Sequence, residues 1–585
     1  MAGLRFTTAA AATLAVTLGG TPAQADLGVP GREADPIVLR GAETPKLAGA
    51  APGAIVAFSH DGGWTQVPVQ VDERAVVDYG VVRQIGNGFD HEAYTDPGTF
   101  AGADPDPTVD AGDEIAFMAK DAGGSATGIR SPDGVVPSSR TVVAIDDPLH
   151  PGSERFVYLF RSDSGLDPAA GRSYVDYDFS LQSGDYKETY DFDGVANVEA
   201  DAPPANPEDS AVTTSAYTQH LLSRWVTDRM TLRTGAVPSP DILDGDKAQV
   251  SRGCGRSELT FSRGGGGFIA NISGPVRAIR SQIGANSGTY TQRDDVYYQR
   301  RQDTVTYLRV HAGIGQISQF RDFSAAASGM TYRSSAYPSG VTIDGIPDAG
   351  IPVPGEASVQ PPIEWEQATG GAGTLNTVSR VDTNLPGYVP GSFYRDEGSS
   401  PTFGQCGGYA DSLSYGTSGV EFKSSGANTD PTLGAAYRLT GTRTTFFDGP
   451  NEDAAAAARR SEQIDDPLAV TVSDEPEPAR PELVVRAGGA QKRVRPGGSV
   501  RIPVRVRNGG GSAAIGVEVC ARAPKRTAAT GRCKGTKLLE AGEGFRAKLR
   551  IDARQRARKR IRITLRASAD NARRDKAEAT VRVRR

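Results

Sequence analysis

Cysteine and histidine are scarce in this chain of 585 residues. The sequence also lacks the motifs of common zinc sites, of serine hydrolases and of phosphate-binding loops. None of the four cysteines has the C-x-x-C spacing of a common zinc site. Five histidines occur without a G-x-S-x-G nucleophile motif, and the glycine run 264–267 is not followed by the Lys and Ser or Thr of a P-loop. The sequence therefore carries no motif specific enough to name a reaction.

Long apolar runs are missing after the N-terminus. Residues 9–18 form an apolar core behind Arg5, and Ala23-Gln24-Ala25 is a small-residue cleavage pattern. This combination predicts a secretory signal peptide over residues 1–25, whose core is too short to span a membrane. No later run reaches about 18 apolar residues. We therefore expect a secreted, extracellular protein whose mature chain begins near Asp26.

Four cysteines in an exported chain favour two disulfides. Cys520 and Cys533 are close together in the C-terminal segment and are expected to pair with each other. Cys254 and Cys406 then pair across the large preceding region, by elimination only.

Long helical patterns are nearly absent, whereas 70 glycines and 38 prolines favour turns and short strands. Residues 217–230 fit either a short helix or two strands. We expect a mainly β protein: a large β-sandwich-type body followed by a small immunoglobulin-like β-sandwich. The expected divisions are a body at 26–450, with or without a subdomain boundary near 170–250, a short helix at 451–463, an acidic proline-rich linker at 464–481 and a basic module at 482–585.

Charge divides the chain sharply. Residues 481–585 hold 29 Lys and Arg against 8 Asp and Glu, a net charge of +21. The remainder holds 36 basic and 62 acidic residues, a net charge of −26. Such asymmetry bears on partners rather than on fold.

The basic segment alternates apolar and basic residues with the period of a strand, and about seven short strands predict a small β-sandwich. Its segments VRVRNGG (504–510), GVEVC (516–520) and ATVRV (579–583) resemble the immunoglobulin-like, CARDB-type modules of secreted bacterial proteins. That resemblance covers residues 481–585 and implies an adhesive or spacer module rather than a catalytic one.

The outward arginines of this module suit an anionic cell-wall polymer, an acidic polysaccharide, lipid headgroups or the acidic body itself. Export and the lack of aromatic residues argue against nucleic acid, because Phe545 is the only aromatic residue after 481. A solvated basic face without a specific partner is the alternative.

Residues 271–311 hold the densest mix of strand pattern, arginine, tyrosine and turn glycine. They predict half-buried strands with one wet face. On that face Arg277, Arg309 and His311 are expected to converge, because guanidinium groups match carboxylate or sulfate. The alternative is an ordinary exposed sheet face with salt-bridged arginines. The further candidate ligand-binding residues are Arg280, Asn286, Tyr290 and Tyr297.

An acidic loop precedes the strand at 114–118. Asp104, Asp106, Asp110, Asp113 and Glu114 offer oxygen ligands of the kind calcium prefers. The EF-hand pattern is not met, because Val109 and Ile115 stand where its glycine and glutamate belong. Calcium therefore competes with a simpler interpretation, a solvated loop stiffened by proline.

Two functions remain open. The Gly274-Pro275-Val276-Arg277 strand start resembles the sandwich domains of polysaccharide lyases and mutarotase-like proteins. That resemblance implies an enzyme in which Tyr298 or His311 acts as base and Arg277 or Arg309 neutralises a uronate carboxyl group. We favour the other function, a secreted surface or extracellular protein that binds a carbohydrate or anionic polymer, because it requires no unproven catalytic group.

Overall fold

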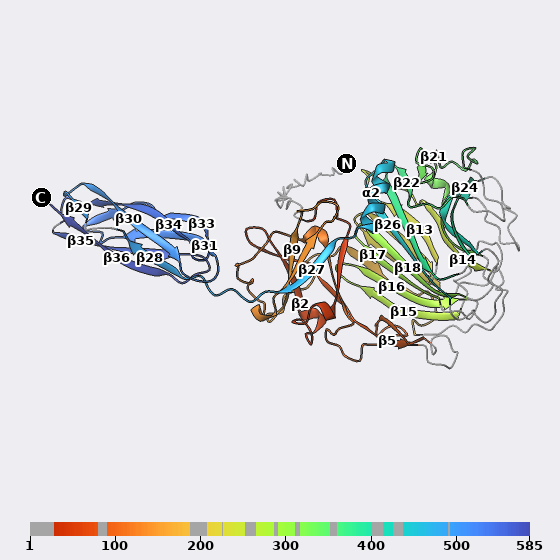
Figure 1. Cartoon of the computed structure of the whole chain (residues 1–585), viewed down its shortest axis with the longest axis horizontal. Helices are drawn as coiled ribbons and strands as arrows, with labels where there is room; N and C mark the ends of the chain where they lie inside the picture. Colours follow the sequence, from red (N-terminus) through yellow and green to blue (C-terminus); the bar gives the residue numbers. More distant parts are fainter. Residues whose placement is uncertain are drawn as a thin grey trace, which may run out of the picture.

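The protein is built from antiparallel strands, which confirms the expected mainly β, sandwich-type fold. The computed structural model describes residues 28–79, 90–187, 207–224, 226–251, 265–285, 291–310, 316–351, 360–385, 387–398, 414–424, 437–488, 492–557 and 559–584. Within these ranges the strands form three groups, with the C-terminal group set apart at one end of the molecule (Figure 1).

The first group is a small sandwich. A three-stranded sheet contains β1 (Pro36–Arg40), β7 (Glu114–Met118) and β4 (Gln70–Asp72), and a hairpin of β5 (Arg74–Asp78) and β6 (Asp90–Tyr94) adjoins it in sequence. Ile37 and Phe117 from this sheet share a core with Val143 and Leu159 from a five-stranded sheet. The order of the five-stranded sheet is β27 (Ala469–Asp474), β8 (Thr141–Asp146), β9 (Arg155–Arg161), β2 (Ile55–His60) and β3 (Trp64–Val67).

The second group is larger and is organised on a nine-stranded sheet. Its order is β15 (Gly265–Ser273), β16 (Ala278–Ala285), β17 (Thr291–Tyr298), β18 (Arg301–Val310), β26 (Tyr437–Asp448), β23 (Gly373–Thr383), β22 (Glu366–Gly370), β20 (Thr331–Ser334) and β21 (Val341–Thr342). Figure 1 shows β15 to β18 side by side in the middle of this group.

Two four-stranded sheets complete the second group. One contains β10 (Val175–Asp178), β11 (Pro207–Thr214), β12 (Tyr217–Ser223) and β13 (Val226–Leu232); the other contains β14 (Leu243–Ser251), β19 (Gln316–Phe323), β25 (Ser414–Ser424) and β24 (Tyr388–Glu397). One core takes Tyr217, Phe323 and Phe447 from the three sheets, and the rings of Tyr217 and Phe447 stack with centroids 3.7 Å apart. The ambiguous segment 217–230 is therefore two strands.

Helix α2 (Ala454–Asp465) is the α-helix among the described residues and lies on the nine-stranded sheet against β22 and β23. It begins three residues later than the sequence predicts, because Asp453 caps it by accepting a hydrogen bond from the amide of Ala456 (3.1 Å).

The predicted linker 464–481 needs a correction. Its residues Ala469–Asp474 form strand β27, which pairs with β8 in the register Val472 to Val143 and lies among the orange strands of the first sandwich in Figure 1. Two acidic residues that follow fasten the chain further: Glu475 pairs with Arg140 (3.1 Å) and Glu477 with Arg130 (3.2 Å). The proline-rich composition concealed a short run of β-branched residues, Val470 to Val472.

The third group, which we call the module, is a sandwich with its own core, drawn from residues between Leu483 and Val581. Its front sheet contains β28 (Leu483–Ala487), β30 (Ser499–Asn508), β34 (Gly544–Ala553) and β32 (Ala528–Thr530). Its back sheet contains β29 (Lys492–Val494), β36 (Asp575–Val583), β35 (Arg560–Ser568), β31 (Ala514–Arg522) and β33 (Lys534–Leu539). The module thus has nine strands rather than the seven expected.

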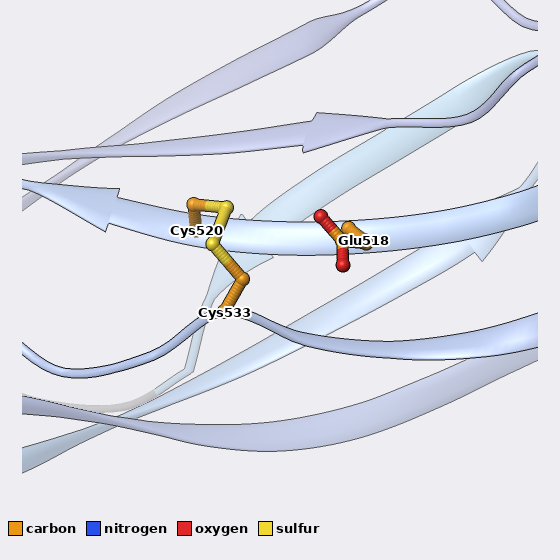
Figure 2. A group of neighbouring side chains, drawn as sticks. All are labelled: Glu518, Cys520 and Cys533. Atoms are coloured by element: carbon orange, nitrogen blue, oxygen red, sulfur yellow. A yellow bond between two sulfur atoms is a disulfide. The ribbon is translucent and has the colours of Figure 1, made fainter. Parts of the chain in front are cut away.

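The predicted Cys520–Cys533 disulfide is confirmed and joins β31 to the chain segment just before β33 (Figure 2). Cys254 and Cys406 lie outside the described residues.

Candidate functional site

Arg277 directly precedes β16 and is buried rather than exposed. Its Nη2 atom lies 2.7 Å from a carboxylate oxygen of Asp72 and 2.7 Å from one of Glu114. Both acids belong to the three-stranded sheet of the first sandwich, so Arg277 joins the two sandwiches. Burial alone would raise the pKa of Glu114, but the charges of Arg277 and Arg74 outweigh it and lower that pKa to about 2.

Arg280, which lies on β16, makes a second buried connection. Its guanidinium binds the carboxylate of Glu208 on β11, with Nη1 2.8 Å from Oε2, and donates a further hydrogen bond to the hydroxyl of Tyr177 (3.1 Å). Both Arg280 and Glu208 are fully buried. This pair ties the nine-stranded sheet to one of its covering sheets.

The expectation of a wet face along this stretch is wrong for β16 and β17. Tyr297 and Tyr298 are buried, and the hydroxyl of Tyr298 lies 3.4 Å from Nη1 of Arg277. The reason is that other layers cover both faces of these strands, since Tyr297 shares a core with Tyr217 and Tyr298 shares one with Met118. The sequence of one strand does not contain this feature. The suggested catalytic and ligand-binding roles stay predictions. His311, Asn286, Tyr290 and the side chain of Arg309 lie outside the described residues.

A buried charge network that the sequence did not indicate lies between the nine-stranded sheet and the sheet of β14, β19, β25 and β24. The carboxylate of Asp246 lies 3.2 Å from Arg443, 3.8 Å from Arg321 and 3.9 Å from Arg293. Burial would raise the pKa of Asp246, but the three arginines lower it. A neighbouring cavity lined by Arg321 and Glu366 measures about 10 Å³, which admits about one water and no sugar.

The acidic loop before β7 folds on itself. Carboxylate oxygens of Asp104, Asp110 and Asp113 accept backbone amides of Asp106 (2.8 Å), Gly112 (2.7 Å) and Asp110 (2.8 Å) respectively. Asp106 likewise accepts the hydroxyl of Thr108 at 2.7 Å. Such local bonds shape a turn and do not by themselves make a cation site.

Two further features of the loop concern its charge. Glu114 faces away, because its oxygens bind Arg74 (2.6 Å), Arg277 and the hydroxyl of Tyr94 (2.8 Å). Burial and the nearby charge of Asp104, followed by Asp113, raise the pKa of Glu73, a residue that the sequence did not suggest. Glu73 Oε1 and Asp104 Oδ2 are buried without a hydrogen-bond partner. Among the described residues, no three acidic residues of this loop bring one carboxylate oxygen each within 4.8 Å of one another.

The front sheet of the module carries the clearest exposed cluster of one charge. A groove of about 1120 Å³ lies on it. No acidic residue lines this groove in the part of the chain that the structure describes, and its basic lining residues are Lys492, Arg501, Arg505, Arg532, Lys534, Arg546, Lys548 and Arg550. All eight are exposed, and within the described ranges only Arg550 has an acidic partner, Asp552 at 2.8 Å.

Strand register arranges these cations in rows across the sheet. Arg505 stands opposite both Arg486 and Arg546, and Arg501 stands opposite Arg550. Like charges directly opposite each other destabilise a sheet, so packing does not account for these rows. Four residues along β30 separate the rows, which is about 13 Å at the rise of a strand.

Between the two rows the sheet carries Pro503 and the exposed Lys548. Pro503 stands opposite Lys548, and on its other side the amide of Gly488 donates to the carbonyl of Pro503 (2.8 Å). The lining residues include Lys492 near one edge of the sheet and Arg532 near the other, so the groove runs across the strands. The Cys520–Cys533 disulfide anchors the segment that carries Arg532 and Lys534 (Figure 2).

The back sheet provides a contrast. Its outer face mixes signs, with Glu518 and Glu578 among its arginines, and Arg562 lies 3.9 Å from Glu578. Among the described residues of the module, the front sheet thus carries a groove lined by basic residues alone among the charged ones, whereas the outer face of the back sheet mixes both signs. The sequence predicted outward arginines, but not the groove, because the rows depend on register between strands far apart in the chain.

Comparisons with known proteins identify no family. No protein-family model matches the chain, and no curated protein matches it. Among solved structures it is similar to an alpha-mannosidase from Enterococcus faecalis, with 9% identity, a TM-score of 0.37 and coverage of 89% of this chain and 55% of that chain. A mutant of Salmonella alpha-2-macroglobulin gives 8% identity, a TM-score of 0.15 and coverage of 91% and 52%. The chain thus spans about half the length of each, and at these scores the likeness carries no function with it. Among the described residues, no helix is long and apolar enough to cross a membrane.

Proposed function

We propose that the protein is a secreted, extracellular binding protein that holds a carbohydrate or anionic cell-wall polymer on the front sheet of its module. The observation that carries this proposal is the groove with eight basic lining residues and no acidic one. Guanidinium groups bind carboxylate, sulfate and phosphate in a fork, and unpaired cations gain most from such a ligand. The resemblance to CARDB-type modules, an adhesive or spacer class, agrees with this role.

A lyase-like activity of the body is the alternative function. Two of the four residues suggested for its catalysis are now poor candidates. The suggested base Tyr298 and the suggested neutralising group Arg277 are both buried and bind each other. A base must reach the proton that it abstracts, so the burial of Tyr298 and Arg277 counts against this pair. His311 and Arg309 remain as candidates for the alternative.

Calcium remains a proposal for the acidic loop. The partnerless oxygens of Glu73 and Asp104 and the raised pKa of Glu73 support it, because uncompensated carboxylates attract a hard cation. Asp104, Asp106, Asp110 and Asp113 would supply further ligands.

The proposed function is tested by retention on immobilised polymers. The full-length mature protein should bind acidic polysaccharides and not neutral ones, and salt should elute it, because contacts between charged groups release counterions. A variant with Arg501, Arg505, Arg546 and Arg550 each changed to Gln should elute at lower salt. Its matched control changes four outward arginines of the back sheet, Arg522, Arg560, Arg562 and Arg582, to Gln.

Equal losses in the two variants, or no retention of the native protein on any anionic polymer, would contradict the proposal. New ultraviolet absorbance from unsaturated products in the same samples would instead favour the lyase alternative.

A further inference from the structure

The groove on the front sheet has a direction, a width and two walls, and these limit what it can hold. They indicate the class of polymer that binds and its orientation on the sheet, which rests on the proposed function and extends it.

The direction follows from which strands supply the lining. Gly488 follows β28, Pro503 lies on β30, Lys548 lies on β34, and Gly531 follows β32, where its amide donates to the carbonyl of Arg550 (2.8 Å). The four positions lie on, or directly after, each of the four strands of the sheet. A chain that followed a single strand would contact only one or two of them, so the long axis of the groove crosses the strands.

The width follows from the register. The row with Arg505 and Arg546 forms one wall, the row with Arg501 and Arg550 forms the other, and about 13 Å along the strands separates them. A slot of this width admits one polymer chain. A membrane is a plane and does not enter it, and the only large apolar side chain of the module that is strongly exposed, among the described residues, is Leu538.

The lining chemistry separates a sugar chain from a nucleic acid. Single-stranded nucleic acids need aromatic platforms on which successive bases stack. Phe545 is the one aromatic residue in the groove, and its ring packs against the core of the module. The remaining lining is basic side chains, glycine and small apolar residues, which bind charged groups and offer no stacking surface.

The two walls suit a particular repeat. Adjacent strands lie about 4.8 Å apart, so the two lining arginines of each wall, Arg505 with Arg546 and Arg501 with Arg550, are close enough to share one anionic group. A sugar chain with one anionic group on each unit, whose successive units are rotated by about half a turn, presents those groups alternately to the two sides. Each wall then receives every second group.

We propose that the groove binds an acidic polysaccharide that lies across the strands, over Gly488, Pro503 and Lys548, with its carboxylate or sulfate groups shared between the two arginine rows. Lys492 at one edge and Arg532 at the other bind groups further along the chain. Nucleic acids and membrane lipids are not ligands of this site.

Titration of the full-length protein with oligo-uronates of increasing length tests the orientation. The affinity should rise steeply until the oligomer spans the four strands, about 14 Å between the outer two, and then level off. Each double variant, Arg501→Gln/Arg550→Gln and Arg505→Gln/Arg546→Gln, should weaken binding of the spanning oligomer about tenfold, since charge-assisted bidentate contacts are lost from one wall. The control Arg562→Gln/Arg582→Gln should change it less than about twofold.

The outcomes are distinguishable. If all three double variants weaken binding equally, or if affinity keeps rising well beyond the spanning length, the polymer is held by the overall positive charge and not by a defined groove. The proposed orientation is then wrong, while the proposed function stands. Tighter binding of single-stranded DNA or of anionic phospholipid vesicles, with the same dependence on the two walls, overturns the polysaccharide class. If no anionic ligand binds at all, the proposed function itself fails.

Discussion

At the scale of single residues, Arg277 shows how an apparent ligand-binding arginine becomes a structural one. It neutralises Asp72 and Glu114 where their side chains are buried between two sandwiches. We expect Arg277→Met to lower the free energy of unfolding by about 3–5 kcal/mol, because removing one partner leaves the other charges buried and unpaired. Urea denaturation followed by fluorescence measures this loss.

The exposed Arg562→Met variant is the control and should change stability by less than about 0.5 kcal/mol. A loss below about 1 kcal/mol in Arg277→Met would show that the interface relaxes and readmits water.

The pKa of Glu114 adds a pH dependence to the stability of the protein. It is lowered to about 2 in the folded state, so its contribution is complete above about 4.5 and is lost as the pH falls toward 2.

Asp294 on β17 is expected to show the opposite dependence. Burial raises its pKa to about 6, although Ser281 and Gln292 donate hydrogen bonds to it. Ionisation of a buried acid with a raised pKa costs stability, so this cost is absent below about pH 4 and complete above about pH 6. Asp294→Asn should therefore raise the midpoint of thermal unfolding at pH 8 and have little effect at pH 4. An equal effect at both pH values would exclude ionisation as the cause.

At the scale of elements, the acidic loop between β6 and β7 gives a test of calcium. A cation that binds only the folded state raises the midpoint of thermal unfolding with its concentration. We expect millimolar calcium to do so in the native protein, and Asp104→Asn/Asp110→Asn to abolish the shift. The exposed Asp176→Asn on β10 is the control. No shift in the native protein would leave the loop as a turn held by its own backbone hydrogen bonds.

Secondary-structure elements are predictable from the sequence where the signal lies within a few neighbouring residues. Alternation and turn residues predicted the mainly β fold, the small C-terminal sandwich and, within three residues, the start of helix α2. Strand β27 was missed, because proline and acidic residues on both sides made its composition look like a linker. The site was less predictable than the fold. Burial of Arg277 and Arg280 depends on layers from distant parts of the chain, and the arginine rows of the module depend on strand register.

At the scale of the whole molecule, the module has a core separate from the cores of the two larger sandwiches, although Ala513 touches the first of them through its amide, which donates to the carbonyl of Gly128 (3.0 Å). We therefore expect calorimetry to show a transition for the module and at least one for the body.

Cys520 and Cys533 are 13 residues apart, and closing a loop of that size stabilises the folded state by about 3 kcal/mol. Cys520→Ser/Cys533→Ser should lower only the module transition, by more than about 10 °C for a unit of this size.

Reduction of that double variant then reports on the body alone. If Cys254 and Cys406 pair as the sequence predicts, dithiothreitol should lower the body transition further and leave it cooperative, because a unit of this size buries enough apolar surface to fold without cross-links. A body transition that does not move on reduction would show that the two cysteines are not joined. A body that unfolds completely on reduction would show that its sheets need the disulfide to stay together.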